Sequence, residues 1–344
     1  MVMTKYERDG AGAGFVERLI ATASPNADRP ALIHDHFGRR VLRRWRDVVA
    51  EIDRLSAGLA ALGVGAGRTV AVGGEVSADL LLVAAAARAA GARLVAVPVA
   101  PTVVDLGALP TDGALAAAIV QGRDALETWL ADDRPALAVP IVFDHATPER
   151  RSPDERIVVV EALRRLAPAR GWADGLRGGS RAAPGGSTWL EETVVSGPVL
   201  ERVLEAWIGG APVLALPERV GSALRDRTAA APTRWIATAD ALDRAAAAIA
   251  NRLPDAGLGA RLLRPVLVGG RSPLAVGLRA LVRTRLGLAS LGEIELVAGA
   301  PAPATLSLFG ALGVDVADFV PRTPPEREAE RPFSDFTLAP GYPL

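Results

Sequence analysis

The sequence predicts an α/β fold of the doubly wound class, and two observations support this prediction. In the first third of the chain, short apolar segments alternate with longer amphipathic ones, which is the rhythm of βαβ units. The segment 94–99 is almost entirely apolar, as expected of a strand in a parallel sheet that is covered on both faces. At 344 residues the chain has room for two or three folding units around a sizeable core.

The first predicted part, 1–146, follows from hydrophobic spacing and from residues that start or stop helices. Residues 47–62 place Val48, Ile52 and Leu55 on one helical face, and Gly63 ends that helix. Ser77 is the N-cap expected for the next helix. The elements predicted in this part are strands 30–35, 40–44, 69–72, 94–99, 114–120 and 139–144 and helices 47–62, 77–90 and 124–130.

The rest of the chain divides into a variable linker, 147–188, a second α/β part, 189–320, and a Pro-rich tail, 321–344. The linker is predicted to contain one amphipathic helix, 154–166, and a Gly-rich loop, 175–187. The elements predicted after the linker are helices 200–208, 239–253, 273–286 and 304–312 and strands 212–216, 263–269, 293–297 and 314–316.

Composition excludes several classes of function. Thirty-nine basic and thirty-nine acidic residues give zero net charge, and no basic stripe with interleaved aromatics indicates nucleic-acid binding. The chain has no cysteine, so disulfides, thiolate metal sites and cysteine nucleophiles are excluded. The most apolar stretch, 79–104, is interrupted by Arg88, Arg93 and Pro98 and predicts helix, turn and strand, with no membrane span. Residues 1–14 lack the apolar core of a signal peptide, so a cytoplasmic protein is expected.

A metal site is not expected. His34 and His36 share one face of a predicted strand and could chelate a metal ion by their spacing. The only carboxylate close to them in the sequence is Asp35, so surface or turn histidines are the preferred interpretation.

Several short segments, in the same order along the chain, resemble motifs of one enzyme family. They are Arg29-Pro30-Ala31-Leu32, 56–67, 89–98, Glu201-Arg202, Pro217-Glu218, Ala231-Pro232-Thr233, Gly299-Ala300-Pro301 and 311–314. Together they resemble the N-terminal half of the adenylate-forming acyl-CoA synthetases, the AMP-binding family, and its long-chain branch in particular. The resemblance covers 1–146 and 189–320 and implies the two packed doubly wound sheets of the N-terminal part of these enzymes.

In that family a loop of small residues that ends in Pro-Lys holds the ATP phosphates, since small residues let backbone N–H groups approach an anion. The resemblance places this loop in the linker, where it is either a degenerate phosphate loop or a plain connection, over Arg177, Gly178, Gly179, Ser180 and Arg181. The chain has a single lysine, Lys5, ahead of the first matching strand. A planar guanidinium does not easily replace the compact ammonium that the family uses there.

Other family landmarks are weak. Of the family's YGxTE motif only Thr323 matches, and Pro324 stands where a metal-binding glutamate is expected. The resemblance assigns vestigial nucleotide contacts to Gly299, Ala300, Pro301 and Thr323, although a plain strand-to-helix turn explains the first three equally well. Glu201 and Arg202 have either a structural role near a helix start or a ligand role. The barrel and the mobile C-terminal lid domain have no counterpart, so a truncated family member is expected.

These departures favour a catalytically degenerate homologue that works as a structural or regulatory subunit, with a protein partner or as a homo-oligomer and without a cofactor. One alternative is an acyl-adenylating ligase that uses ATP, Mg and CoA and is completed by a partner subunit. Another is an acyl- or nucleotide-binding sensor without turnover. In the tail, Phe333, Phe336 and Tyr342 either belong to a disordered segment or anchor an extended peptide on a partner or on the parent sheet.

Overall fold

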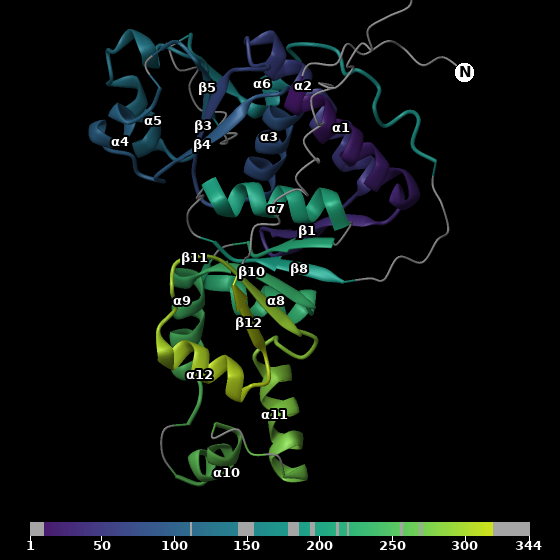
Figure 1. Ribbon diagram of the computed structural model, residues 1–344, viewed down its shortest axis with the longest axis vertical. Coiled ribbons are helices and arrows are strands. Elements are labelled where there is room, and N and C mark those ends of the chain that lie inside the picture. The colour runs from purple at the N-terminus through teal and green to yellow at the C-terminus, as the bar shows by residue number, and fades with distance from the viewer. Residues whose placement is uncertain are drawn as a thin grey trace, which may run out of the picture.

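The structure is a computed structural model, which describes residues 10–110, 112–143, 155–177, 186–192, 197–210, 213–218, 220–254, 257–267, 270 and 272–318. The described residues form two β-sheets with helices on both faces of each, stacked along the long axis of the molecule (Figure 1). The α/β doubly wound prediction with two packed sheets is therefore confirmed.

The first sheet has five parallel strands in the order β4-β3-β5-β6-β7. They are β3 (Thr69–Gly73), β4 (Arg93–Val97), β5 (Leu115–Val120), β6 (Ile141–Phe143) and β7 (Ile157–Val159). Every residue of β5 is buried, because helices cover both faces of the sheet. The helices beside this sheet are α1 (Gly10–Ala23), α2 (Trp45–Ala61), α3 (Ala78–Ala89), α4 (Val103–Gly107), α5 (Arg123–Leu130) and α6 (Val160–Leu163).

The second sheet has seven strands in the order β12-β11-β10-β8-β9-β1-β2, and all neighbours are parallel except the hairpin β1–β2. Its strands are β1 (Pro30–His36), β2 (Arg39–Arg44), β8 (Ser187–Leu190), β9 (Val213–Leu216), β10 (Arg234–Thr238), β11 (Glu293–Ala298) and β12 (Asp315–Asp318). The helices in this half are α7 (Gly197–Gly210), α8 (Ala223–Ala230), α9 (Ala239–Ala250), α10 (Gly257–Leu267), α11 (Pro273–Arg285) and α12 (Pro303–Ala311).

Among the described residues, three apolar cores lie between the sheets and the helices that cover them. One lies between the first sheet and helices α4 and α5, and another between the second sheet and helices α8, α9 and α12. The largest core fills the space between the two sheets, where α1, α2, α3 and α7 meet. Helix α7 runs between the sheets (Figure 1), and its Trp207 donates a 2.9 Å hydrogen bond to the backbone oxygen of Ala31 at the start of β1. Among the described residues, no helix is long and apolar enough to cross a bilayer.

The sheets do not follow the order of the chain segments. Strands β1 and β2 come from the segment 1–146 but pair within the seven-stranded sheet, where β1 lies beside β9. Strand β7 comes from the segment 147–188 and extends the five-stranded sheet. The two halves of the molecule are therefore tied together by exchange of strands as well as by the shared core.

Two predicted elements are wrong in type. The segment 154–166 was expected to be one amphipathic helix, but Ile157–Val159 forms strand β7 and only Val160–Leu163 is helical. Three consecutive β-branched residues suit a strand that pairs with β6 better than a helix. Residue 154 itself lies outside the described residues.

The segment 263–269 was expected to be a strand, but its described residues belong to helix α10. In the sheet β10 pairs directly with β11, so this segment does not insert between them although it lies between them in the chain. Pro265 lies inside this helix, where its missing N–H removes one backbone hydrogen bond, so it does not decide between helix and strand. Two central strands, β8 and β10, were not predicted, because each has only four or five residues and follows a loop-like segment.

Gly58 of α2 should be required by packing. A methyl group at this position would lie 2.2 Å from the backbone oxygen of Leu163 in α6, and that backbone atom cannot rotate away. We expect Gly58→Ala to lower the free energy of unfolding by about 1–3 kcal/mol, because the two helices must separate. The matched control is Gly14→Ala in α1, where nothing lies within 4 Å. That substitution should leave stability unchanged or raise it by up to about 1 kcal/mol, since alanine is the better helix former. Urea unfolding of both variants measures this, and equal effects would contradict the packing argument.

Candidate functional site

The winding of the seven-stranded sheet identifies one edge as the place where a ligand would bind. From β8 the chain passes through α7, on the face toward the first sheet, to β9 on one side. It then returns through α8, on the opposite face, to β10 on the other side of β8. Open α/β sheets bind ligands beyond the carboxyl ends of their strands at such a switch point. The residues that follow β8 and β10 are therefore the first candidates.

Two buried glutamates follow β8 directly. Glu192 accepts hydrogen bonds from the backbone N–H of Thr238, at 2.6 Å, and from its hydroxyl group, at 2.9 Å. Thr238 is the last residue of β10 and also caps α9, because its hydroxyl oxygen accepts the N–H of Ala241. Burial raises the pKa of Glu192 to about 7, against the opposing effect of the bonds from Thr238. Near neutral pH this carboxyl group therefore exists in both protonation states.

Glu191 points toward α8 and takes part in a buried ion pair. Its carboxylate accepts hydrogen bonds from the Arg227 guanidinium and from the Trp189 indole, both at 2.9 Å. The Arg227 guanidinium also lies 4.7 Å from the centre of the Trp235 ring. Burial raises the pKa of Glu191, and the positive charge of Arg227 opposes that shift. The strand end is thus filled by two carboxylates whose donors come from the protein itself.

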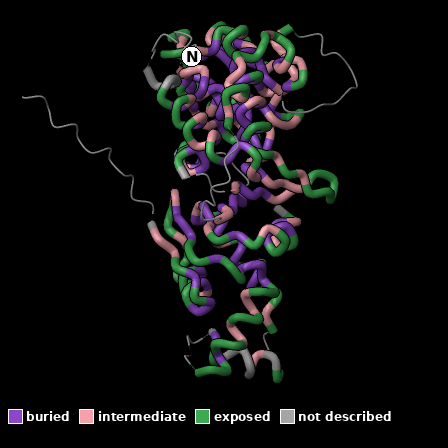
Figure 2. Tube along the Cα trace, turned by 90° about the vertical axis from the view of Figure 1, so that its right-hand side faces the viewer, coloured by how far each residue is buried: buried purple, intermediate pink, exposed green. Residues whose placement is uncertain are grey.

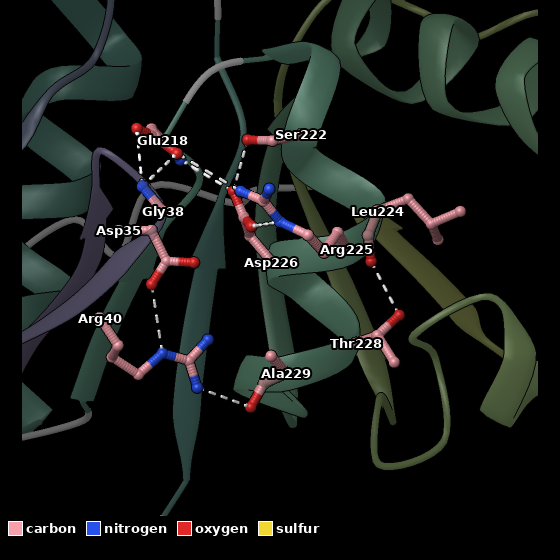
Figure 3. Close-up of polar contacts among 10 residues, drawn as sticks. All are labelled: Asp35, Gly38, Arg40, Glu218, Ser222, Leu224, Arg225, Asp226, Thr228 and Ala229. Atoms are coloured by element: carbon pink, nitrogen blue, oxygen red, sulfur yellow. Dashed lines mark hydrogen bonds and ion pairs between the residues drawn. The ribbon is translucent and has the colours of Figure 1, made fainter.

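The neighbouring strand end, after β9, is occupied by Glu218. Its carboxylate accepts the backbone N–H of Gly38 in the β1–β2 turn, with both oxygens at 3.2 Å, and lies 3.4 Å from Arg225 (Figure 3). The hairpin is fixed a second time by Arg40, which donates to the backbone oxygen of Ala229 at the end of α8. Glu218 therefore anchors a turn and does not face an empty space.

The end of β11 carries the segment Gly299–Pro301 of the expected nucleotide site. Gly299 has a φ of +82° and stands so close to α9 that a methyl group there would lie 2.8 Å from the Ala239 side chain. Asp243 of α9 binds the next residues, accepting the N–H of Ala302 at 3.1 Å and the Thr305 hydroxyl at 2.5 Å. Gly299 and Ala300 are exposed at the same edge of the sheet as Glu192. Whether this segment contacts a nucleotide stays a prediction.

The other predicted residues are not gathered at this edge. Arg202 of α7 donates through Nε and Nη2 to the two carboxylate oxygens of Glu295 in β11, so it has a structural partner, while Glu201 is exposed. Arg177 is exposed and follows a turn whose backbone is held by Asp53 of α2. Gly178, Gly179, Ser180, Arg181, Thr323 and the aromatic residues of the tail lie outside the described residues.

The described part of the chain contains no group of three or more histidines and carboxylates that could hold a metal ion. His34 is half-buried, and its pKa is lowered by burial and by the charge of Arg43. His36 packs against the exposed ring of Phe37.

Sequence reasoning missed Glu191, Glu192 and Arg227. The signal that could have found the two glutamates is a pair of carboxylates directly after the apolar dipeptide Trp189-Leu190 and shortly before a predicted helix. Arg227 carried no signal, because only the fold brings it to Glu191 from a distant helix.

The sequence and the fold of this chain give different results when each is compared with known proteins. No protein-family model matches the sequence, and neither does any curated protein. Many solved structures nevertheless match the fold of this chain.

The A domain of a carboxylic acid reductase from Segniliparus rugosus, solved with AMP and a co-purified carboxylic acid, matches at a TM-score of 0.60 with 15% identity, over 90% of this chain and 61% of that one. A long-chain-fatty-acid-CoA ligase (FadD1) from Archaeoglobus fulgidus matches at 0.59 with 10% identity, over 91% of this chain and 64% of that one. The N-terminal domain of FACL13 from Mycobacterium tuberculosis matches at 0.54 with 14% identity, over 88% of this chain and 74% of that one.

The class of protein is thus an α/β protein with two packed doubly wound sheets and a switch point between β8 and β10. More particularly, its fold is that of the N-terminal domain of adenylate-forming acyl-CoA and carboxylic acid ligases, as the sequence resemblance predicted. The chain spans 61% of the length of the carboxylic acid reductase domain.

Glu192 should make stability depend on pH. The pKa of Glu192 is higher in the folded protein than in the unfolded chain, so the folded protein binds the proton more tightly. The stability that this proton contributes is fully present below the unfolded pKa and is lost as pH rises through about 7. We expect the protein to lose about 3 kcal/mol of unfolding free energy, relative to Glu192→Gln, between about pH 5 and about pH 8. Urea unfolding at both pH values measures the difference, with Glu201→Gln as an exposed control. Parallel pH profiles for the protein and Glu192→Gln would contradict the assignment.

Removing one partner of the Glu191–Arg227 pair should destabilise the protein more than replacing both partners with apolar residues. Glu191→Leu leaves the Arg227 guanidinium buried without its carboxylate, and we expect a loss of about 3–5 kcal/mol in unfolding free energy. The double variant Glu191→Leu/Arg227→Met removes both charges and should recover most of this loss. Urea unfolding of the two variants provides the test; a double variant no more stable than the single one would argue against a coupled pair.

Proposed function

We propose that this protein is a catalytically inactive relative of the adenylate-forming ligases, which acts as a structural or regulatory subunit through protein contacts. The observation that supports the proposal is the pair Glu191 and Glu192 at the end of β8. A phosphate group at this switch point needs free backbone N–H groups and a positive charge. Here it would meet two carboxylates instead.

Two of the donors next to this strand end are also already used. The N–H of Thr238, at the start of α9, is bound to Glu192, and the Arg227 guanidinium is bound to Glu191. The chain's single lysine, Lys5, precedes in sequence every helix and strand of the described residues. Bringing in ATP beside these groups would require breaking buried contacts and placing phosphate charge near the carboxylate of Glu191, and both effects oppose binding.

A function through protein contacts is supported by the β1–β2 hairpin. The ring of Phe37, at its tip, is 80% exposed, and the turn that carries it is held by Glu218 and Arg40. An exposed aromatic side chain on a fixed turn is suited to anchor a partner, because little conformational freedom is lost on binding.

The proposal predicts no acyl-dependent exchange of labelled pyrophosphate into ATP, for the protein alone or with a partner purified from its host. Calorimetry with ATP, AMP and acyl-CoA separates the remaining alternatives. Exchange would establish an acyl-adenylating ligase, and saturable binding without exchange would establish a sensor. An active acyl-CoA synthetase, assayed in parallel, shows that the substrates and conditions are adequate.

The protein should also associate. We expect light scattering at micromolar concentration to give a mass above that of one chain, and Phe37→Ser to shift that mass toward the monomer. Leu166→Ser, at another exposed apolar residue, is the control. A clean monomer for the unchanged protein would count strongly against a function through self-association.

A further inference from the structure

One segment has a strongly uneven charge, although the chain as a whole is neutral. Residues 256–292 contain no aspartate, glutamate, lysine or histidine. They contain six arginines, and the segment therefore carries a formal charge of +6: Arg261, Arg264, Arg271, Arg279, Arg283 and Arg285. Because the whole chain sums to zero, the remainder carries a charge of −6. The segment contains the helices α10 and α11.

These two helices project from one end of the long axis of the molecule, beyond the second sheet and away from the first (Figure 1). The tube coloured by burial shows mostly exposed and half-buried residues at this end (Figure 2). Several large aliphatic side chains here are open to solvent, namely Leu258 at 77%, Leu274 at 65%, Val276 at 51% and Leu281 at 55% exposed. Apolar groups of this size are normally buried when they gather on one surface.

Helix α11 carries exposed leucines beside its buried face. On the face toward the protein, Ala275 is buried and Leu278 and Val282 pack against the core. Leu274 and Leu281 are exposed and seven residues apart, which places them about 10 Å from each other along one flank of the helix, next to Leu278. An ordinary surface helix would carry polar residues along such an exposed flank, so these two leucines require an explanation.

Four arginines of this segment have described side chains, and none of the four is paired with a carboxylate among the described residues. Arg279 and Arg283 donate to backbone carbonyl oxygens, those of Gly270 at 2.9 Å and Leu288 at 3.0 Å. Burial and the neighbouring charge of Arg279 lower the pKa of Arg283, as expected where cations gather. Arg261 and Arg285 are exposed, and within the described residues no carboxylate pairs with either. The positive charge is therefore available to an external partner.

We propose that the exposed side of α10 and α11, with Leu258 and Arg261 on α10 and Leu274, Leu281 and Arg285 on α11, binds the surface of an anionic lipid bilayer. Aliphatic side chains flanked by arginines are the combination by which amphipathic helices enter the boundary between headgroups and acyl chains. Each arginine near such a surface gains electrostatic attraction to the anionic lipids. This inference is separate from the inactivity proposed above and does not depend on it.

Two features favour a bilayer over an acidic protein. The exposed apolar residues are all aliphatic, whereas protein interfaces depend on aromatic anchors. The helices also project at the end of the molecule (Figure 1), so they can reach a flat surface without interference from the rest of the fold.

The experiment is flotation of the full chain with vesicles of phosphatidylcholine alone or with about 30% phosphatidylglycerol, an anionic lipid. We expect binding only to the anionic vesicles, and loss of most of it between about 0.1 M and about 0.5 M salt, where the screening length falls about twofold. Leu274→Ser/Leu281→Ser should weaken binding about tenfold or more, because two apolar side chains no longer insert. Arg261→Gln/Arg285→Gln should also weaken it about tenfold or more.

The matched control variants have the same kinds of substitution, apolar to serine and arginine to glutamine, at exposed positions outside α10 and α11. Val103→Ser/Val104→Ser alters two exposed valines on α4, at the far end of the molecule, and Arg18→Gln/Arg39→Gln removes two exposed charges. Both should bind like the unchanged protein, and all four variants should unfold at the same temperature as it does. No binding of the full chain to anionic vesicles, or equal weakening by the controls, would overturn the proposal.

The same measurements would also show whether a second copy of the chain, or another segment of this chain, covers the surface. If a second copy covers it, light scattering would show a dimer that Leu274→Ser/Leu281→Ser dissociates, with no vesicle binding. If residues 319–344 cover it, only a chain without them would bind vesicles. Either result would overturn the proposal for the full chain.

Discussion

The structure depends above all on the burial of α7 between the two sheets. One broad face of this helix is apolar, and Val199, Val203 and Trp207, spaced four residues apart, all lie inside the largest core. Trp207 is bonded to the first strand of the second sheet, and Arg202 binds Glu295 of β11 on the same sheet. Because α7 is the next helix in the chain after β8, the same helix fixes the distance between the sheets and the position of the switch point. Any ligand or partner at that edge is therefore coupled to the packing of the whole molecule.

The carboxyl edge of the second sheet combines a binding topology with an unusual charge. Parallel strands and helix starts meet there, as in sheets that bind anions, but the chain places Glu191, Glu192 and Glu218 at the ends of two adjacent strands. Each of these carboxylates is satisfied by a donor from another element, namely Arg227, Thr238 and Gly38. The edge is thus held together by contacts within the protein, while the arginine-rich segment lies at the far end, on α10 and α11.

The sequence predicted the elements whose patterns are long or regular. The helix over 47–62 and the buried strand 114–120 were confirmed within one or two residues, because their apolar spacing has a single explanation. Short or mixed segments failed. Strands β8 and β10 were missed, and 263–269 was given the wrong type, because an apolar run of a few residues fits a buried strand and a helix equally well. Of the candidate site, the sequence predicted Gly299–Pro301 but neither of the glutamates beside it.

By itself, the sequence determined the fold class, the order of most elements and the likeness to the N-terminal part of adenylate-forming ligases. These follow from local spacing, from glycine and proline positions, and from collinear motifs, none of which needs long-range contacts. Only the tertiary structure decided which sheet receives β1 and β2, where the switch point lies, and that Arg227 faces Glu191. It also revealed that Leu274 and Leu281 face solvent. The physical reason is that burial, pKa and charge pairing depend on residues distant in the chain, and such neighbours exist only once the sheets and helices have packed.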